Sequence, residues 1–378
     1  MKGIVAVSQV VKFARNLFGG VMHAARAESL GYGAYAAMVA SRLTSADMGR
    51  SLAAARGTAP KHSIKHIDRI AGNGKIDMDA SFGAYVRHIV GCRKSLLLSL
   101  DWTEYDSDNQ SRISVNIITK HGRATPLIWI TVSKDNLKNK RYKHECDVLT
   151  KLRELLPEDI SVIVIADRGF GDVKFYKYIS TELTWDYIIR FKDCIFVEDE
   201  AGEKRKAKDW RYKNGATREI VNAKVTGKRK SVPSVVLVKQ RGMKDAWNIA
   251  TSIAGKKKRV VRLYGRRFSC EEQFRDEKDD RFGLGSKETR ISTPARRDRL
   301  LLLHALSTLV LTVLGAAGEA LHWDKDLRAN TSKVRTHSLF AQGRAYFRWV
   351  VRPHQELLDL FWRMLKALPR TAEETGVI

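Results

Sequence analysis

The strongest constraint in the sequence is a continuous run of β-branched and aliphatic residues from Ile160 to Ala166. A strand that is apolar at successive positions must be buried on both faces, and such strands are typical of parallel sheets covered by helices. The run ends at Asp167. The sequence therefore predicts an α/β sheet with a carboxylate at the carboxyl end of an inner strand.

The segments around this run predict the order of the other elements. Ser95 to Leu100 is a second apolar strand, and it ends in Asp101. Three antiparallel strands, a helix, a strand, a helix and a strand make up the order of a ribonuclease-H-like α/β core. The segments that supply the remaining elements are 113–119 and 126–132 as strands, about 140–156 as a helix, 173–183 as a helix and 185–191 as a strand.

Five parts follow from these element types. We expect a helical DNA-binding domain, the first part of the ribonuclease-H-like core, an inserted β-rich subdomain, a catalytic helix region that completes the core, and a helical C-terminal region for dimerisation and DNA contacts. Their predicted bounds are 1–90, 91–192, 193–258, 259–295 and 296–378. The apolar run from Leu300 to Ala317 is interpreted as a buried helix and not as a membrane span, because it contains His304 and several hydroxyl side chains.

The net charge of the chain indicates what class of molecule it binds. The chain carries 68 Lys and Arg residues against 42 Asp and Glu residues, which gives a formal charge of +26. Such an excess favours a polyanion, and its spread along the whole length favours nucleic acid over an anionic membrane surface. The four cysteines form no Cys-x-x-Cys pair, so we expect free thiols in a reducing cytosol. Ser8, Gln9, Lys12 and Arg15 interrupt the apolar residues near the N-terminus, so we expect no secretory signal peptide.

Two segments near the N-terminus have the layout of a helix-turn-helix. One helix begins at about Ser45 and is ended by Gly57, and a second begins at Pro60. Lys61, Lys65 and Arg69 fall mainly on the outer faces of the second helix, where they could meet DNA phosphates. An ordinary solvated helix pair is the alternative interpretation of the same pattern.

A third carboxylate is needed to complete a two-metal site, because such sites hold their ions roughly 4 Å apart with several oxygen ligands. On one continuous helix, Tyr264, Arg267, Glu271 and Lys278 fall at roughly 0°, 300°, 340° and 320°, in one stripe. The mixture of a phenol, a guanidinium, a carboxylate and an ammonium suits a phosphodiester site. A charged, solvated helix face remains the alternative for an isolated stripe.

The spacing Tyr-x2-Arg-x3-Glu-x6-Lys, formed by these four residues, resembles the signature of the insertion-sequence family four transposases. Asp167 to Asp172 is similar to the second-aspartate motif of that family, and Leu100 to Thr103 to its first. Further likeness covers 61–69, 271–276 and 323–330. The resemblance implies an Asp-Asp-Glu transposase with Asp101, Asp167 and Glu271 as catalytic and metal-binding residues. It also implies two Mg²⁺ ions, for which Mn²⁺ can substitute.

The same resemblance implies roles for further side chains. Tyr264, Arg267 and Lys278 are expected to contact phosphates at the transposon end. Trp247 resembles the family tryptophan that receives a flipped base, with a buried strand tryptophan as the alternative. Arg168 and Arg275 are candidate DNA contacts that could instead form local ion pairs.

The resemblance further implies cut-and-paste transposition: end nicking, hairpin formation and opening, and strand transfer. The expected partners are double-stranded DNA, as terminal inverted repeats and target, and a second copy in a paired-end homodimer. No membrane partner is expected, and the predicted location is the cytoplasm of a bacterium, at the nucleoid. A catalytically silent DNA-binding relative and another ribonuclease-H-like nuclease stay open as alternatives. A recombinase that bonds covalently to DNA through Tyr264 is not favoured, because that mechanism would need neither Asp101 nor Asp167.

Overall fold

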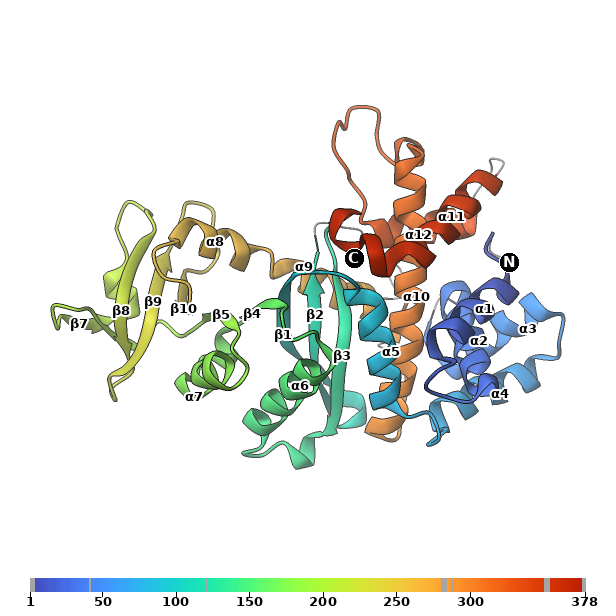
Figure 1. The fold of residues 1–378 in the computed structure, drawn as a ribbon, viewed down its shortest axis with the longest axis horizontal. Helices are drawn as coiled ribbons and strands as arrows, with labels where there is room; N and C mark the ends of the chain where they lie inside the picture. Colours follow the sequence, from blue (N-terminus) through green and yellow to red (C-terminus); the bar gives the residue numbers. More distant parts are fainter. Residues whose placement is uncertain are drawn as a thin grey trace. The chain divides into compact units, whose positions relative to one another are not determined.

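The structure is a computed structural model that describes residues 4–40, 42–119, 121–279, 284–286, 289–349 and 354–375. The chain divides into two compact units. The helical unit comprises 1–93, 102–140 and 269–378, and the sheet unit comprises 94–101 and 141–268. Figure 1 labels the elements of both.

Five helices make up the N-terminal part of the helical unit: α1 (Val7–Phe18), α2 (Ala24–Val39), α3 (Ser45–Arg56), α4 (Pro60–Gly72) and α5 (Met78–Val90). The pair Gly31 and Gly33, which in the sequence looks like a turn, lies inside α2. A Cβ on Gly31 would stand 2.6 Å from the Cα of Val11. These glycines therefore serve close helix packing, and the turn prediction is wrong.

The predicted helix pair is present as α3 and α4. Thr44 caps α3, since its hydroxyl oxygen accepts a hydrogen bond from the Asp47 amide, and Gly57 ends the helix with a φ of 66°. The two helices cross closely, because a Cβ on Gly49 would stand 2.4 Å from the Cα of Ile64. The sequence predicted both helix ends through a turn glycine and an N-terminal proline.

The long helix α10 (Pro294–Ala320) is the centre of the helical unit (Figure 1). It packs on α2, α4 and β3 (Ala124–Ser133), and also on α11 (Leu339–Trp349) and α12 (Gln355–Thr375). Among the described residues it is the one helix long and apolar enough to cross a membrane, and 94% of its apolar window is buried inside the protein. The predicted buried helix is therefore confirmed.

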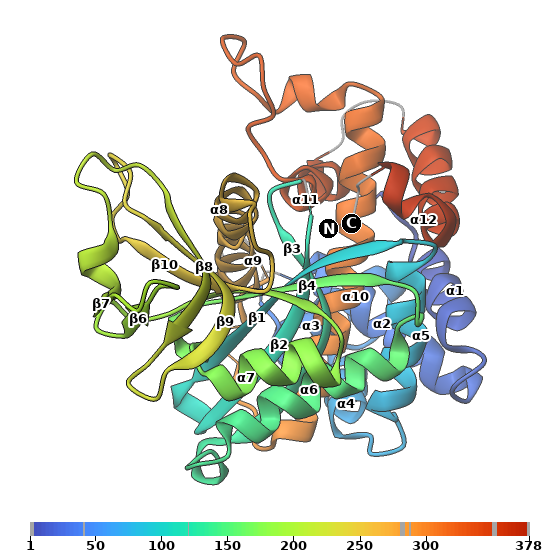
Figure 2. The same cartoon turned by 60° about the vertical axis from the view of Figure 1, so that its left-hand side comes forward.

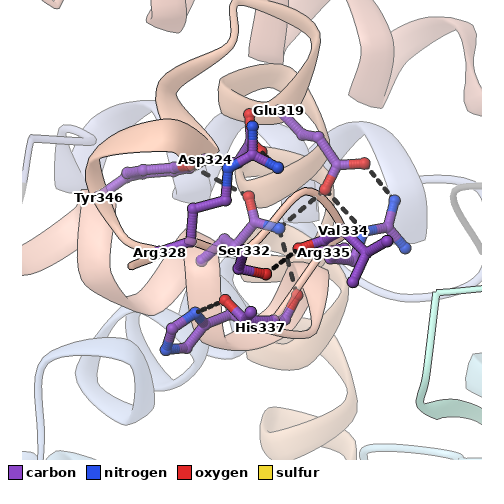
Figure 3. A network of polar contacts seen from close by, with 10 residues as sticks. Glu319, Asp324, Arg328, Ser332, Val334, Arg335, His337 and Tyr346 are labelled. Atoms are coloured by element: carbon purple, nitrogen blue, oxygen red, sulfur yellow. Dashed lines mark hydrogen bonds and ion pairs between the residues drawn. The ribbon is translucent and has the colours of Figure 1, made fainter. Parts of the chain in front are cut away.

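A polar network fastens the segment between α10 and α11 (Figure 3). Arg335 forms an ion pair with Glu319 near the end of α10. Gln342 donates from Nε2 to Glu319 Oε2 at 2.8 Å, and Tyr346 donates to Gln342 Oε1 at 3.1 Å. These bonds hold the segment against both helices.

Ten strands are described, in the hydrogen-bonded order β3-β2-β1-β4-β5-β10-β9-β8-β6-β7. In the helical unit β2 (Gln110–Ile118) pairs antiparallel with β3. β1 (Ser95–Tyr105) belongs to both units, its first seven residues to the sheet unit. The mixed α/β class predicted from the sequence is confirmed.

The sheet unit combines a parallel and an antiparallel part. β1, β4 (Ser161–Ala166) and β5 (Asp186–Arg190) are parallel. β10 (Trp247–Thr251), β9 (Lys230–Val238) and β8 (Arg218–Val225) continue antiparallel, followed by β6 (Phe196–Glu198) and β7 (Lys204–Lys206). Helices α6 (Arg141–Leu155) and α7 (Val173–Lys177) lie side by side (Figure 2), with the Tyr142 and Phe175 rings 6.4 Å apart. The division into an inserted subdomain and its flanks stays a prediction.

Helix α9 (Phe268–Lys278) is held in the helical unit by a buried ion pair. Arg112 Nη1 on β2 donates to both carboxylate oxygens of Glu277 at 2.9 Å, and Tyr105 donates to Glu277 at 2.7 Å. The side chains of Arg112 and Glu277 are 4% and 1% exposed. Burial acts to raise the pKa of Glu277, but Arg112, His304 and Tyr105 outweigh it and the pKa is lowered. Glu277 is therefore an anchored anion.

Replacing Arg112 by methionine should lower the free energy of unfolding by about 3 kcal/mol or more, because it leaves the Glu277 charge buried without its partner. The double variant Arg112→Met, Glu277→Leu should recover most of that loss, since neither charge remains. Urea denaturation followed by circular dichroism measures both. A single variant as stable as the wild type would show that this pair does not hold α9.

Candidate active site

Strand register places two carboxylates side by side in the sheet unit. β1 and β4 run parallel with Leu100 opposite Ala166, so Asp101 and Asp167 are the next residues on neighbouring strands. Parallel strands carry their carboxyl ends to one edge of a sheet, where α/β proteins present their sites. Both aspartates are half-buried. The sequence predicted this arrangement on condition that the two strands are neighbours, and the condition is met.

β1 does not end at Asp101, as the sequence suggested, but continues to Tyr105. Asp101 therefore lies inside β1, just past the last residue that pairs with β4. The extension pairs with β2, which precedes it in the sheet order. The apolar run gives no sign of this, because the residues beyond Asp101 are held by a different neighbour.

Arg190 occupies the corresponding position on the next strand, β5. It was not among the site residues predicted from the sequence. Ala166 on β4 is opposite Ile189 on β5, so Arg190 follows Ile189 as Asp167 follows Ala166. Its side chain is 17% exposed, and its Nη2 lies 3.6 Å from Asp245. The predicted strand 185–191 ends one residue later, at Phe191, so the available signal was an arginine near the end of an apolar strand.

The chain turns sharply after Asp167. The amide of Gly169 donates to Asp167 Oδ1 at 2.7 Å, and the amide of Lys174 donates to Asp172 Oδ1 at 2.8 Å, which caps α7. A Cβ on Gly169 would stand 3.0 Å from the same Asp167 oxygen. The turn therefore fixes the Asp167 carboxylate, while Arg168 is exposed.

Tyr264 and Arg267 complete the group in the sheet unit. Arg267 Nη1 lies 3.3 Å from Asp101 Oδ2. Burial raises the pKa of the Tyr264 phenol, and the charges of Arg267 and Arg190 oppose that rise while Asp167 adds to it. The phenol is therefore a neutral hydrogen-bond donor, and it shares its surroundings with two guanidinium groups and a carboxylate.

Trp247 stands at the start of β10, beside this group. Its ring meets the Tyr264 ring edge to face, with centroids 4.9 Å apart. The Phe268 ring lies 6.3 Å away on a tilted plane and is half exposed. Trp247 itself is only partly buried. An aromatic surface accessible to solvent thus borders the two arginines and the two aspartates.

The continuous helix assumed for the Tyr264 to Lys278 stripe is wrong. α8 (Lys257–Gly265) ends before Arg266 and Arg267, which form a turn, and α9 begins at Phe268. The angles given for these four residues on one continuous helix therefore do not apply across the break between α8 and α9. Tyr264 and Arg267 belong to the sheet unit, whereas Glu271 and Lys278 belong to the helical unit.

On α9 the predicted residues occupy its outer side. Glu271 and Arg275 are exposed, and Lys278 is half-buried with its Nζ 5.7 Å from the centre of the Tyr105 ring. Arg275 lies 2.5 Å from Glu272, which is the local ion pair considered as its alternative role. The inner side is buried through Cys270, Gln273, Asp276 and Glu277.

Asp101 and Asp167 offer the oxygen donors that hard divalent cations prefer. Within the described ranges, no three His, Cys, Asp or Glu side chains are grouped so that they could hold a metal ion. Two of the three carboxylates predicted to bind metal, Asp101 and Asp167, thus belong to the sheet unit, and the third, Glu271, belongs to the helical unit.

The basic residues predicted for the helix-turn-helix lie on the outside of α4. Lys61, Lys65 and Arg69 are all exposed, and Ser63, Ile67, Ile70 and Ala71 are buried. This arrangement leaves three cations of one helix accessible to a polyanion.

Part of the chain is similar to a known protein family. Residues 134–309, a little under half of the chain, match the family model of the transposase DDE domain. The match supports a DDE transposase, a class of enzyme that acts on DNA and generally uses divalent metal ions, and the mixed α/β sheet fits the ribonuclease-H-like core of that class. Asp167, Tyr264, Arg267 and Glu271 lie inside the matched range, and Asp101 precedes it. None of the curated proteins matches the chain significantly.

If the two aspartates hold a divalent cation, Asp101→Asn with Asp167→Asn should reduce Mn²⁺ affinity by about tenfold or more, because each change removes an anionic ligand. Titration followed by electron paramagnetic resonance counts free Mn²⁺ directly. Asp106→Asn with Asp135→Asn, two exposed aspartates of the helical unit, is the control. Equal Mn²⁺ binding by both double variants would remove the metal role.

Proposed function

We propose that the protein is a DNA transposase that cuts and rejoins DNA by phosphoryl transfer, with Asp101, Asp167 and Glu271 as its catalytic carboxylates. The observation that carries the proposal is the register that sets Asp101 beside Asp167 at one edge of the sheet. The similarity to transposase DDE domains supports the same reaction class.

The proposed cofactor is a pair of Mg²⁺ ions, for which Mn²⁺ can substitute, held by the three carboxylates. Bound ions of this kind polarise a phosphate and lower the pKa of an attacking water or hydroxyl. Two adjacent aspartates repel each other, so a site of this composition favours cations. Arg267 offsets part of that repulsion through its contact with Asp101.

The cationic side chains are proposed to bind the DNA backbone. Arg267 and Arg190 present guanidinium groups, whose planar donors suit two phosphate oxygens at once. Tyr264, kept neutral by burial, can donate one further hydrogen bond. Lys278 adds a cation from α9. These groups hold the scissile phosphate and stabilise charge that builds on its oxygens.

The proposed reaction is a series of in-line displacements at phosphorus. In the first, a water oxygen bonds to phosphorus and the bond to the 3′ oxygen breaks, which frees a 3′-hydroxyl. That hydroxyl then attacks the phosphorus of the opposite strand and displaces the 3′ oxygen of the flanking DNA, which forms a hairpin. A water oxygen attacks the hairpin phosphorus and displaces the same 3′-hydroxyl, which finally attacks a target phosphorus and displaces a target 3′ oxygen. The protein forms no covalent bond to DNA in this scheme.

A hairpin is tightly bent, so one base must leave the stack. Trp247 is proposed to receive it, because aromatic rings bind bases by stacking. The exposed Phe268 ring beside it supplies a second surface. A purely structural role for Trp247 fits less well, since its ring is only partly buried.

We further propose that the chain is of the insertion-sequence family four type, most like the transposase of the tetracycline-resistance composite transposon. The support is the signature formed by Tyr264, Arg267, Glu271 and Lys278. Its substrate would be terminal inverted repeats bound by a homodimer with two paired ends, in the bacterial cytoplasm. Lys61, Lys65 and Arg69 on α4 would contact the repeat, and Arg168 and Arg275 would add backbone contacts.

Alanine at Asp101, Asp167 or Glu271 should reduce cleavage of an end-containing DNA by about a thousandfold or more, because each carboxylate supports the same charge in the transition state. Binding of that DNA should change little, as measured by gel shift. A silent DNA-binding relative predicts no cleavage by the wild type either. Wild-type cleavage after any one of these changes would exclude this active site.

Trp247→Ala should leave first-strand nicking intact and reduce hairpin yield by about tenfold, because the displaced base loses a stacking partner. Denaturing gels resolve nicked and hairpin products in one reaction. Trp210→Ala is unsuitable as a control, since Trp210 is fully buried, and Tyr212→Ala at an exposed aromatic serves instead. Unaltered hairpin yield from Trp247→Ala would rule out the flipped-base role.

A further inference from the structure

A wide groove runs between α1 and α12 in the helical unit, with α5 beneath it. Its volume is about 980 Å³, at the upper end of the range for pockets that bind ligands. The apolar lining comes from all three helices and comprises Phe13, Leu17, Val21, Ala84, Trp362, Leu365 and Pro369. Leu365 and Ala84 are buried, whereas Phe13, Leu17 and Trp362 are half exposed.

The charged residues that line the groove are all of one sign. Lys12, Arg87 and Lys366 stand at its rim, one on each of the three helices, and all three are exposed. Among the residues that the structure describes, no acidic side chain belongs to the lining. His88 is the remaining titratable side chain there, and burial lowers its pKa to about 4, so it is neutral near pH 7.

The walls of the groove are fixed by contacts on its outer sides. The Cys92 amide donates to the Pro369 carbonyl at 2.9 Å, which ties α12, at a proline inside the helix, to the turn after α5. α1 is packed on α2 through Val10, Val11, Ala14 and Phe18. The groove is therefore preformed, and an occupant need not spread the helices.

We infer that this groove is a docking site for an acidic amphipathic helix of a partner protein. The apolar lining matches the apolar stripe of such a helix. Its carboxylates would meet Lys12, Arg87 and Lys366 at the rim. Duplex DNA fits less well, because its phosphates call for a polar surface and would leave the apolar lining uncovered.

Fluorescence anisotropy tests this with a labelled synthetic helix of about 15 residues, a length that can sustain a helix. The probe has leucines along one face and glutamates on the others, and a matched probe has lysine in place of each glutamate. The full chain should bind the glutamate probe at least about tenfold more tightly than the lysine probe. Equal affinity for the two, or no binding of the glutamate probe, would overturn the inference.

Reversing the charge of two lysines at the rim tests whether the glutamate probe binds in this groove. Lys12→Glu with Lys366→Glu should weaken binding of the glutamate probe by about tenfold or more. Lys75→Glu with Arg363→Glu carries the same charge change at exposed positions outside the groove and should change affinity by less than about twofold. Equal loss in both double variants would mean a general charge effect and would overturn the inference.

Trp362→Ala removes the largest apolar side chain of the lining, so it should weaken binding of the glutamate probe by about tenfold. Two further measurements test the other possible occupants of the groove, which are nucleic acid and a second copy of the chain. Binding of a labelled thymidine oligonucleotide that Lys12→Glu with Lys366→Glu abolishes would assign the groove to nucleic acid. A change from dimer to monomer in the same variant, seen by sedimentation, would assign it to self-association. Either result overturns the inference.

Discussion

The parallel pairing of β1 with β4 fixes where the two aspartates stand, because Leu100 is opposite Ala166 and the next residue on each strand is a carboxylate. A shift of one residue would turn one of them to the other face of the sheet. Arg267 pairs with Asp101 at 3.3 Å, and the Gly169 amide donates to Asp167 at 2.7 Å, so each carboxylate is held by a different neighbour.

The proposed third carboxylate depends on a different set of interactions. Glu271 lies on α9, whose position in the helical unit is set by the buried pair of Arg112 and Glu277 and by Arg123, which pairs with Asp276. These contacts direct one side of α9 inward and leave Glu271 on the other. The three proposed catalytic carboxylates therefore come from both units, Asp101 and Asp167 from the sheet unit and Glu271 from the helical unit.

Local patterns predicted much of this arrangement. The β-branched run to Ala166, the proline at the start of α4 and the turn glycine after α3 each act on their own neighbours, so the sequence alone identifies them. Contacts between residues distant in sequence determine the features that these local patterns did not predict. The helical period continues through Arg266, yet Tyr264 is buried against Trp247 and Cys270 is buried in the other unit. Gly31 lies within a helix because Val11 passes close to it. Arg190 joins the site through strand register.

Hydroxyl-radical cleavage by Fe²⁺ bound in place of the proposed metal tests the central claim most directly, because it cuts the backbone only next to the ion. The protein, mixed with double-stranded DNA, is treated with Fe²⁺ and ascorbate, and the fragments are mapped. The account predicts cuts near Asp101, Asp167 and Glu271, all suppressed by excess Mg²⁺. Cuts near Asp101 and Asp167 without any near Glu271 would contradict it.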